Sequence, residues 1–101
     1  MVCFHGGSHV SGQGHSLIFD GTTLAQHDVL VVTIDYRIGP LGFLDHPWLS
    51  AEAASDSAVG PSGNYGLVGA LAALHWGKGN IEEIGGDDEN VTIFRQAGGC
   101  K

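Results

Sequence analysis

Three short runs of apolar, mostly β-branched residues divide the chain, and stretches rich in glycine and polar residues separate them. The runs are residues 1–4 (MVCF), residues 29–36 (VLVVTIDY) and residues 91–94 (VTIF). The second run shows no alternation of polar and apolar side chains, which is typical of a strand covered on both faces in a parallel sheet. The pattern therefore predicts three strands, of which the second has the clearest signal.

Two segments between these runs have the composition or spacing of helices. Residues 20–28 (DGTTLAQHD) predict a short helix that Asp20 can cap. Residues 64–83 carry small and large apolar side chains at helical spacing, namely Leu67, Ala70, Leu71 and Leu74. The glycines at 77 and 79 are predicted to end this second helix. The order strand, helix, strand, helix, strand indicates a parallel sheet with right-handed crossovers.

The remaining segments are predicted to be irregular. Residues 5–16 (HGGSHVSGQGHS) follow neither the helical nor the strand period, and residues 85–90 (GGDDEN) are typical of a turn. Residues 37–63 are punctuated by glycine and proline, which favours one long loop. No repeat and no second domain is visible, so residues 1–101 are expected to form a single α/β domain.

Composition narrows the classes of partner. The net charge is −7, from 4 Lys and Arg against 11 Asp and Glu, so nucleic acid and anionic membrane surfaces are not expected partners. No apolar stretch is long enough to span a bilayer, and no signal peptide pattern is visible. Two cysteines, Cys3 and Cys100, are too few for a disulfide framework, which favours free thiols and leaves the compartment open.

The glycine pair after the first run is the first candidate for chemistry. A strand that ends in His5-Gly6-Gly7 leaves backbone N–H groups outside the sheet ladder. Because glycine has no Cβ, consecutive N–H groups can point at one spot and hold a developing negative charge. One well-placed donor of this kind contributes about 2.7–4 kcal/mol to a transition state. On its own, however, a glycine turn after a strand is more often structural.

Four longer segments carry a family resemblance: FHGGSHVSG, VLVVTIDYRIGPLGFL, SGNYGLVGALAALHW and NIEEIGGDDENVTIF. In order and approximate spacing they resemble the type B carboxylesterase/cholinesterase family, over nearly the whole chain. The resemblance implies an α/β fold, here an incomplete α/β-hydrolase core of three parallel strands with connecting helices, in which the first strand lies between the other two. It also implies serine-dependent hydrolysis of carboxylic esters, with no cofactor. Members of the family are several times longer than 101 residues.

The resemblance also locates the missing chemistry. The family's nucleophile elbow has the pattern Gly-Glu-Ser-Ala-Gly-Gly, whereas this chain has RQAGGC at residues 95–100. Aligned without a gap, Ala97 takes the place of the nucleophilic serine; with one residue deleted, the serine is absent. Neither alignment provides a nucleophile. The family's acid and histidine are expected beyond Lys101, and none of the six histidines here matches that histidine.

The donors of the oxyanion hole are implied by the same resemblance to be Gly6, Gly7, Ser8 and Gly98. Ser8 stands where the family usually has a third glycine, which changes the expected donor geometry. Gly69 replaces an aspartate that the family is expected to pair with the arginine matching Arg37. Loss of one partner of a buried ion pair costs roughly 3–5 kcal/mol.

Metal chemistry is not expected. His5, His9 and His15 lie at mixed spacing, and no cysteine or carboxylate pattern accompanies them. The acidic residues 87–89 lack the glutamate that an EF-hand requires, so they are interpreted as a solvated turn.

We therefore interpret the chain as a truncated fragment of a carboxylic ester hydrolase, expected to be inactive alone. Its full-length form is expected to act on a small-molecule carboxylic ester. Two alternatives stay open: a non-catalytic cholinesterase-like binding or adhesion domain, and a non-functional truncated gene product. Because the outer strands of such a partial sheet have unpaired edges, self-association is also expected.

Overall fold

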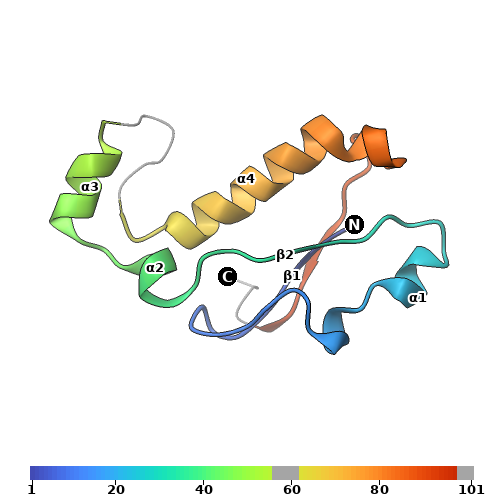
Figure 1. Cartoon of the computed structure of the whole chain (residues 1–101), viewed down its shortest axis with the longest axis horizontal. Coiled ribbons are helices and arrows are strands. Elements are labelled where there is room, and N and C mark those ends of the chain that lie inside the picture. Colours follow the sequence, from blue (N-terminus) through green and yellow to red (C-terminus); the bar gives the residue numbers. More distant parts are fainter. Residues whose placement is uncertain (56–61, 98–101) are drawn as a thin grey trace.

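The structure, a computed structural model, describes residues 1–55 and 62–97 (Figure 1). Its elements, in chain order, are β1 (Val2–Phe4), the 3₁₀ helix η1 (Leu17–Phe19), α1 (Thr22–Ala25), β2 (Val32–Ile34), α2 (Gly39–Phe43), α3 (Pro47–Ala53), α4 (Tyr65–Asn80), the 3₁₀ helix η2 (Ile81–Ile84) and β3 (Ile93–Arg95). The strands form one parallel sheet in the order β2-β1-β3. The prediction that the first strand lies between the other two is confirmed.

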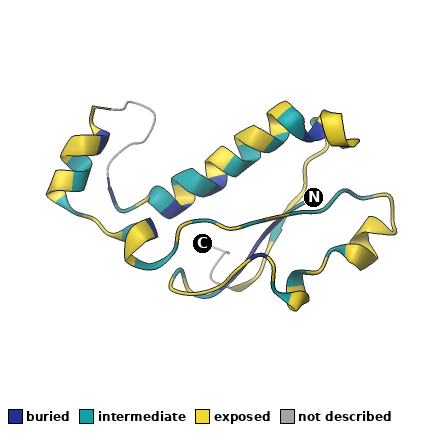
Figure 2. Ribbon diagram, in the orientation of Figure 1, coloured by how far each residue is buried: buried dark blue, intermediate teal, exposed yellow. Residues whose placement is uncertain are grey.

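The core lies where the centre of the sheet meets α4. Figure 1 shows α4 running diagonally beside the strands, and Figure 2 shows that little of the ribbon is fully buried. The buried apolar side chains come from β1, α3, α4 and η2: Cys3, Phe4, Ala53, Ala70 and Ile81. Leu67 and Trp76, which lie on opposite sides of α4, remain 57% and 56% exposed. Because exposed apolar side chains lie on more than one side of α4, this helix is of the kind that further structure covers.

The second strand is shorter than the sequence predicts. Of residues 29–36, only Val32–Ile34 pair with β1, and Thr33 is exposed rather than covered on both faces. The pairing is short because β1, the strand beside it, has only three residues. Within the described residues no strand pairs with the other edge of β2. The β-branched run therefore indicated the position of the strand correctly and its length wrongly.

The prediction of one long loop at residues 37–63 is wrong, because α2 and α3 lie within this segment. Pro40 and Pro47 each occupy the first turn of one of these helices, where the fixed φ of proline is favourable and no N–H is needed. At the start of α3 the His46 ring accepts a hydrogen bond from the Trp48 N–H at 3.2 Å. The prolines that suggested a loop are therefore the residues that begin the helices.

The end of α4 also differs from the prediction. The helix continues through the glycines at 77 and 79 to Asn80, and η2 follows directly. Neither glycine has a positive φ, so the chain does not turn at these positions. The change of direction comes at Gly85, which has a φ of +88°. The predicted turn at residues 85–90 is confirmed, with the Glu89 N–H donating to Asp87 Oδ1 at 3.0 Å.

Replacing glycine with alanine is expected to have opposite effects at two positions of α4. A Cβ at Gly69 would meet no atom within 4 Å, so Gly69→Ala is expected to stabilise the fold by about 1 kcal/mol through helix propensity. A Cβ at Gly66 would overlap the carbonyl oxygen of Arg37 and lie 2.7 Å from Cε2 of Phe43, so Gly66→Ala is the matched control and is expected to destabilise. Urea unfolding followed by circular dichroism measures both. Equal midpoints for the two variants would contradict the packing of α4 described here.

Candidate functional site

The carboxyl ends of the three strands meet at one edge of the sheet because the strands are parallel. The loop after β1 and the turn after β3 touch at this edge. A Cβ built on Gly6 would lie 2.7 Å from the carbonyl oxygen of Gln96 and 3.1 Å from Cβ of Ala97. Gly6 is buried, and the Gln96 N–H donates to the Phe4 carbonyl at 3.4 Å. Only a residue without a side chain fits at position 6 in this arrangement.

The backbone after Gly6 is held in a rarely adopted form. Gly7, Ser8 and His9 have φ values of +121°, +55° and +64°. Left-handed backbone costs roughly 1–2 kcal/mol for each residue with a Cβ. The carbonyl of Gly7 accepts from the N–H groups of Val10 and Ser11 at 3.0 and 3.1 Å, which closes the turn. Such strain persists only where the surrounding contacts determine the conformation.

Within the described residues, the first N–H groups of this turn do not take part in the backbone hydrogen bonds that close it. In residues 1–55 and 62–97, no hydrogen bond outside the strand ladders has the N–H of Gly6, Gly7 or Ser8 as its donor. These are the three described members of the predicted oxyanion hole, and they lie consecutively in one loop. The fourth, Gly98, lies outside the described residues. That these donors hold an oxyanion stays a prediction.

Ala97 lies two residues after the end of β3, is exposed, and has a φ of +48°. Its methyl group therefore stands beside Gly6, where the predicted chemistry needs a hydroxyl. Within the part of the chain that the structure describes, no serine hydroxyl is hydrogen-bonded to a histidine ring. The Ser50 and Ser62 hydroxyls bond to each other at 2.6 Å. The described residues thus hold no activated serine.

Residues at the end of β2 support the loop, and sequence reasoning missed them. Tyr36 donates its hydroxyl hydrogen to the His5 carbonyl at 2.8 Å, and its ring stacks on the His5 ring with centroids 4.5 Å apart. Asp35 accepts from the Gly14 N–H at 2.6 Å. Asp35 oxygens also lie 3.7 Å from ring nitrogens of His5 and His15. The available signal was the polar pair Asp-Tyr directly after an apolar run.

Burial changes the acidity of two groups in this region. It raises the pKa of the Tyr36 hydroxyl, because the phenolate is disfavoured away from water. It also raises the pKa of the Cys3 thiol, which lies in the middle of β1 and is a free cysteine. Within the described residues, no group of three or more His, Cys, Asp and Glu side chains is arranged to hold a metal ion. None of the described helices is long and apolar enough to span a membrane.

The raised pKa of Tyr36 predicts a pH dependence. The folded protein holds this proton more tightly than the unfolded chain, so the contribution to stability is fully present below the ordinary tyrosine pKa, about 10. It is lost as pH rises through the higher pKa of the folded state. Urea midpoints measured from pH 8 to 11 should therefore fall more steeply for the wild type than for Tyr36→Phe. Parallel curves for the two proteins would contradict the prediction.

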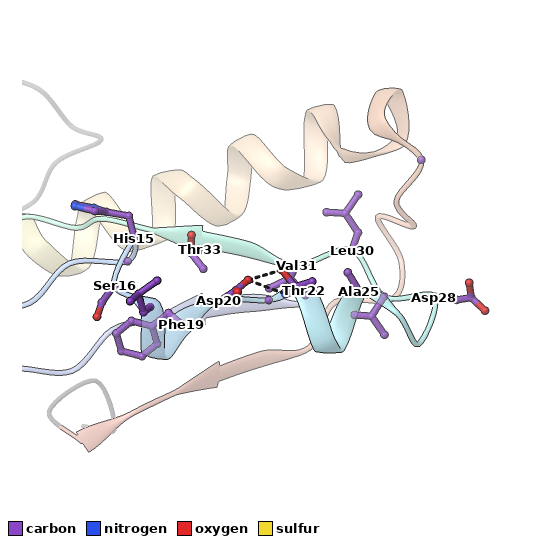
Figure 3. Close-up of a pocket in the computed structure, with 15 residues that line it drawn as sticks. His15, Ser16, Phe19, Asp20, Thr22, Ala25, Asp28, Leu30, Val31 and Thr33 are labelled. Atoms are coloured by element: carbon purple, nitrogen blue, oxygen red, sulfur yellow. Dashed lines mark hydrogen bonds between the residues drawn. The ribbon is translucent and has the colours of Figure 1, made fainter.

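A large cavity lies away from this site. It has a volume of about 950 Å³ and lies between α1 and the segment that leads into β2 (Figure 3). Two of its polar side chains bond to each other: Asp20 accepts from the Thr22 N–H at 3.0 Å and the Thr22 hydroxyl at 2.5 Å. These bonds lower the pKa of Asp20. The predicted N-cap is wrong by one residue, because Gly21 holds that position, but the Asp20 side chain still accepts from the first N–H of α1. Gly6, Gly7, Ser8 and Ala97 do not line this cavity.

The positions of Arg37 and Gly69 can be located in the structure. Arg37 is exposed and makes no ion pair with any described residue. At Gly69, in α4, a side chain would enter open space. The position that the resemblance assigns to the aspartate therefore has room for a side chain and carries none.

Comparison with known proteins gives one consistent result. A model of the carboxylesterase family matches residues 1–101. Fumonisin B1 esterase of Sphingopyxis macrogoltabida is 48% identical over 99% of this chain, and para-nitrobenzyl esterase of Bacillus subtilis (strain 168) is 45% identical over 98%. Mouse neuroligin-2 is 43% identical over 99% of the chain. The chain spans 18%, 19% and 11% of these three proteins.

Solved structures agree on the fold. Carboxylesterase EST55 of Geobacillus stearothermophilus matches 93% of this chain with a TM-score of 0.74 and 40% identity, and the chain covers 19% of it. A structure of PNB esterase matches 95% with a TM-score of 0.79 and 40% identity, and the chain covers 18% of it. The predicted incomplete α/β-hydrolase core, three parallel strands with connecting helices, is therefore confirmed. On the family match over its whole length, the chain belongs to the carboxylesterase family.

Proposed function

We propose that these 101 residues are the part of a carboxylic ester hydrolase fold that supplies the oxyanion loop, and that they do not turn over esters by themselves. The contact between Gly6 and Ala97 carries the proposal. It brings the loop that can stabilise negative charge against the position from which a nucleophile would attack. At that position the chain presents a methyl group.

The consequence follows from how acyl transfer works. Oxyanion donors act on the charge that appears when a nucleophile adds to the carbonyl carbon. Without an attacking group that charge does not form, and loss of the nucleophile in a serine hydrolase costs on the order of 10⁶ in turnover. The N–H groups of Gly6 and Gly7 then have no intermediate to stabilise. Three consecutive backbone donors do not replace a missing hydroxyl.

The substrate class proposed for the whole protein is a small-molecule carboxylic ester. The names of two relatives, fumonisin B1 esterase and para-nitrobenzyl esterase, support this class. The net charge of −7 does not favour nucleic acid as a partner. Specificity in this fold depends on loops around the site. We therefore expect the residues that select one ester over another to lie in the four-fifths of such a protein that this chain does not include.

A second candidate is a non-catalytic cholinesterase-like binding domain. The 43% identity to mouse neuroligin-2 is close to the identities with the two esterases, and alanine at position 97 fits a site without catalysis. The coding DNA beyond Lys101 separates the two candidates. A downstream acid and histidine at the family's spacing support the hydrolase, whereas a complete fold without them supports the binding domain.

Hydrolysis of p-nitrophenyl acetate tests the proposal. The folded 101-residue chain is expected to release p-nitrophenolate no faster than the same chain after heat treatment. An active carboxylesterase at equal concentration is the positive control. Saturable turnover by the folded chain that disappears on heating would overturn the proposal.

A further inference from the structure

We propose that Tyr36 is the residue that positions the candidate oxyanion loop, by holding both ends of residues 5–9 against the end of β2. This inference rests on the proposed function, because it concerns the loop to which that function assigns the charge stabilisation. The contacts of Tyr36 with described residues are to Phe4, His5 and His9, and none of these is the position of the nucleophile. It is therefore a positioning residue rather than a catalytic one.

Tyr36 holds the first end of the loop through two contacts with one residue. Its hydroxyl donates to the His5 carbonyl at 2.8 Å, and its ring stacks on the His5 ring at 4.5 Å with an interplanar angle of 15°. The hydrogen bond fixes the backbone of His5, and the stacking fixes its side chain. His5 is 1% exposed, so neither contact competes with water.

His5 in turn restrains the glycine that follows it. Its Nδ1 lies 2.8 Å from the carbonyl oxygen of Gly6, and because a carbonyl only accepts, Nδ1 must carry the hydrogen. Gly12 packs closely on both partners of this bond, since a Cβ there would overlap Nδ1 of His5 and the oxygen of Gly6. The peptide that follows His5 is therefore held in one orientation.

The same tyrosine also contacts the far end of the loop. The ring of His9 lies edge-on to the ring of Tyr36 at 6.5 Å and stacks on Phe43, from α2, at 4.7 Å. Between His5 and His9 lie Gly7 and Ser8 with positive φ. The ring of Tyr36 therefore contacts both ends of a strained stretch and adds to the hydrogen bonds that the Gly6 and Gly7 carbonyls accept.

The test compares three variants of the 101-residue chain. Tyr36→Phe removes only the hydroxyl, and Tyr36→Leu removes the ring as well. Tyr65→Phe is the matched control, because Tyr65 donates its hydroxyl hydrogen to the Leu49 carbonyl at 3.4 Å, away from the loop. Two-dimensional ¹H–¹⁵N spectra follow the amides of Gly6, Gly7 and Ser8, and long-range ¹⁵N spectra report which ring nitrogen of His5 carries hydrogen.

The expected result is specific to the loop. In wild type and in Tyr65→Phe, His5 shows the Nδ1–H form and the heteronuclear NOE of Gly7 and Ser8 is that of ordered backbone. In Tyr36→Phe those NOE values fall by at least a factor of two while those of α4 stay unchanged. Tyr36→Leu adds a mixture of the two His5 ring forms.

Two outcomes would overturn the inference. The first is wild-type loop signals in Tyr36→Phe. The second is a loss of order in Tyr36→Phe that spreads equally over α4, since that marks a general packing role. If Tyr36→Leu does not fold, Tyr36→Phe still tests the inference, because this variant lacks only the hydroxyl oxygen and keeps the ring. These readouts need no ester, so failure of the proposed function in the hydrolysis assay leaves them informative.

Discussion

Replacing Gly6 with alanine is expected to destabilise the chain by about 1–3 kcal/mol, the usual cost of forcing an extra methyl group into packed structure. The added Cβ would lie 2.7 Å from the backbone oxygen of Gln96 and 3.1 Å from Cβ of Ala97. Both neighbours lie just beyond β3, which pairs with β1 through only three residues. The turn after β3 must therefore move, and the contact on which the candidate site is built opens.

The matched control is Gly79→Ala, because a Cβ at Gly79 would meet nothing within 4 Å. Urea midpoints should fall for Gly6→Ala and rise or stay level for Gly79→Ala. The amide signals of Gln96 and Ala97 should shift in the first variant only. A Gly6→Ala protein with the wild-type midpoint would show that the loop and the turn do not touch.

The arrangement of strands could be predicted from the sequence, but not their lengths. The three apolar runs identified the strands, and the resemblance placed the first strand between the other two. Pairing, however, depends on the partner as well as on the run itself. Residues 29–36 have strong β propensity along their whole length, yet β1 offers only three residues to pair with. Tertiary context therefore shortened the strand.

The two missed helices show a similar limit. Proline ends a helix when it falls inside one and begins a helix when it falls in the first turn, so Pro40 and Pro47 are ambiguous without the surrounding structure. The Ser62 hydroxyl accepts from the His46 N–H at 2.9 Å and donates to Asp45 Oδ1 at 2.8 Å. These contacts join segments 16 and 17 residues apart, and no local pattern reports them.

At the site, the meeting of Gly6 and Ala97 followed from topology, because neighbouring parallel strands place their following residues side by side. The part played by Tyr36 did not follow. Whether a side chain after β2 reaches back to the loop after β1 depends on sheet register and on the depth of the His5 ring. Those are properties of the folded chain rather than of any short segment.

The second large effect is expected in covalent labelling. A fluorophosphonate reacts with a serine whose hydroxyl is activated by a neighbouring base. Position 97 is alanine, and in residues 1–55 and 62–97 the Ser50, Ser55 and Ser62 hydroxyls bond to one another, to Asp45 or to backbone. None of these partners is a base of the kind that activates a serine. We therefore expect no reaction at these three serines and none at position 97.

Intact mass measurement after incubation with a fluorophosphonate tests the central claim most directly. The folded chain should keep its unmodified mass under conditions in which an active carboxylesterase is fully labelled. A stoichiometric adduct, mapped to a serine beside the Gly6 and Gly7 amides, would show that this loop works with a nucleophile after all.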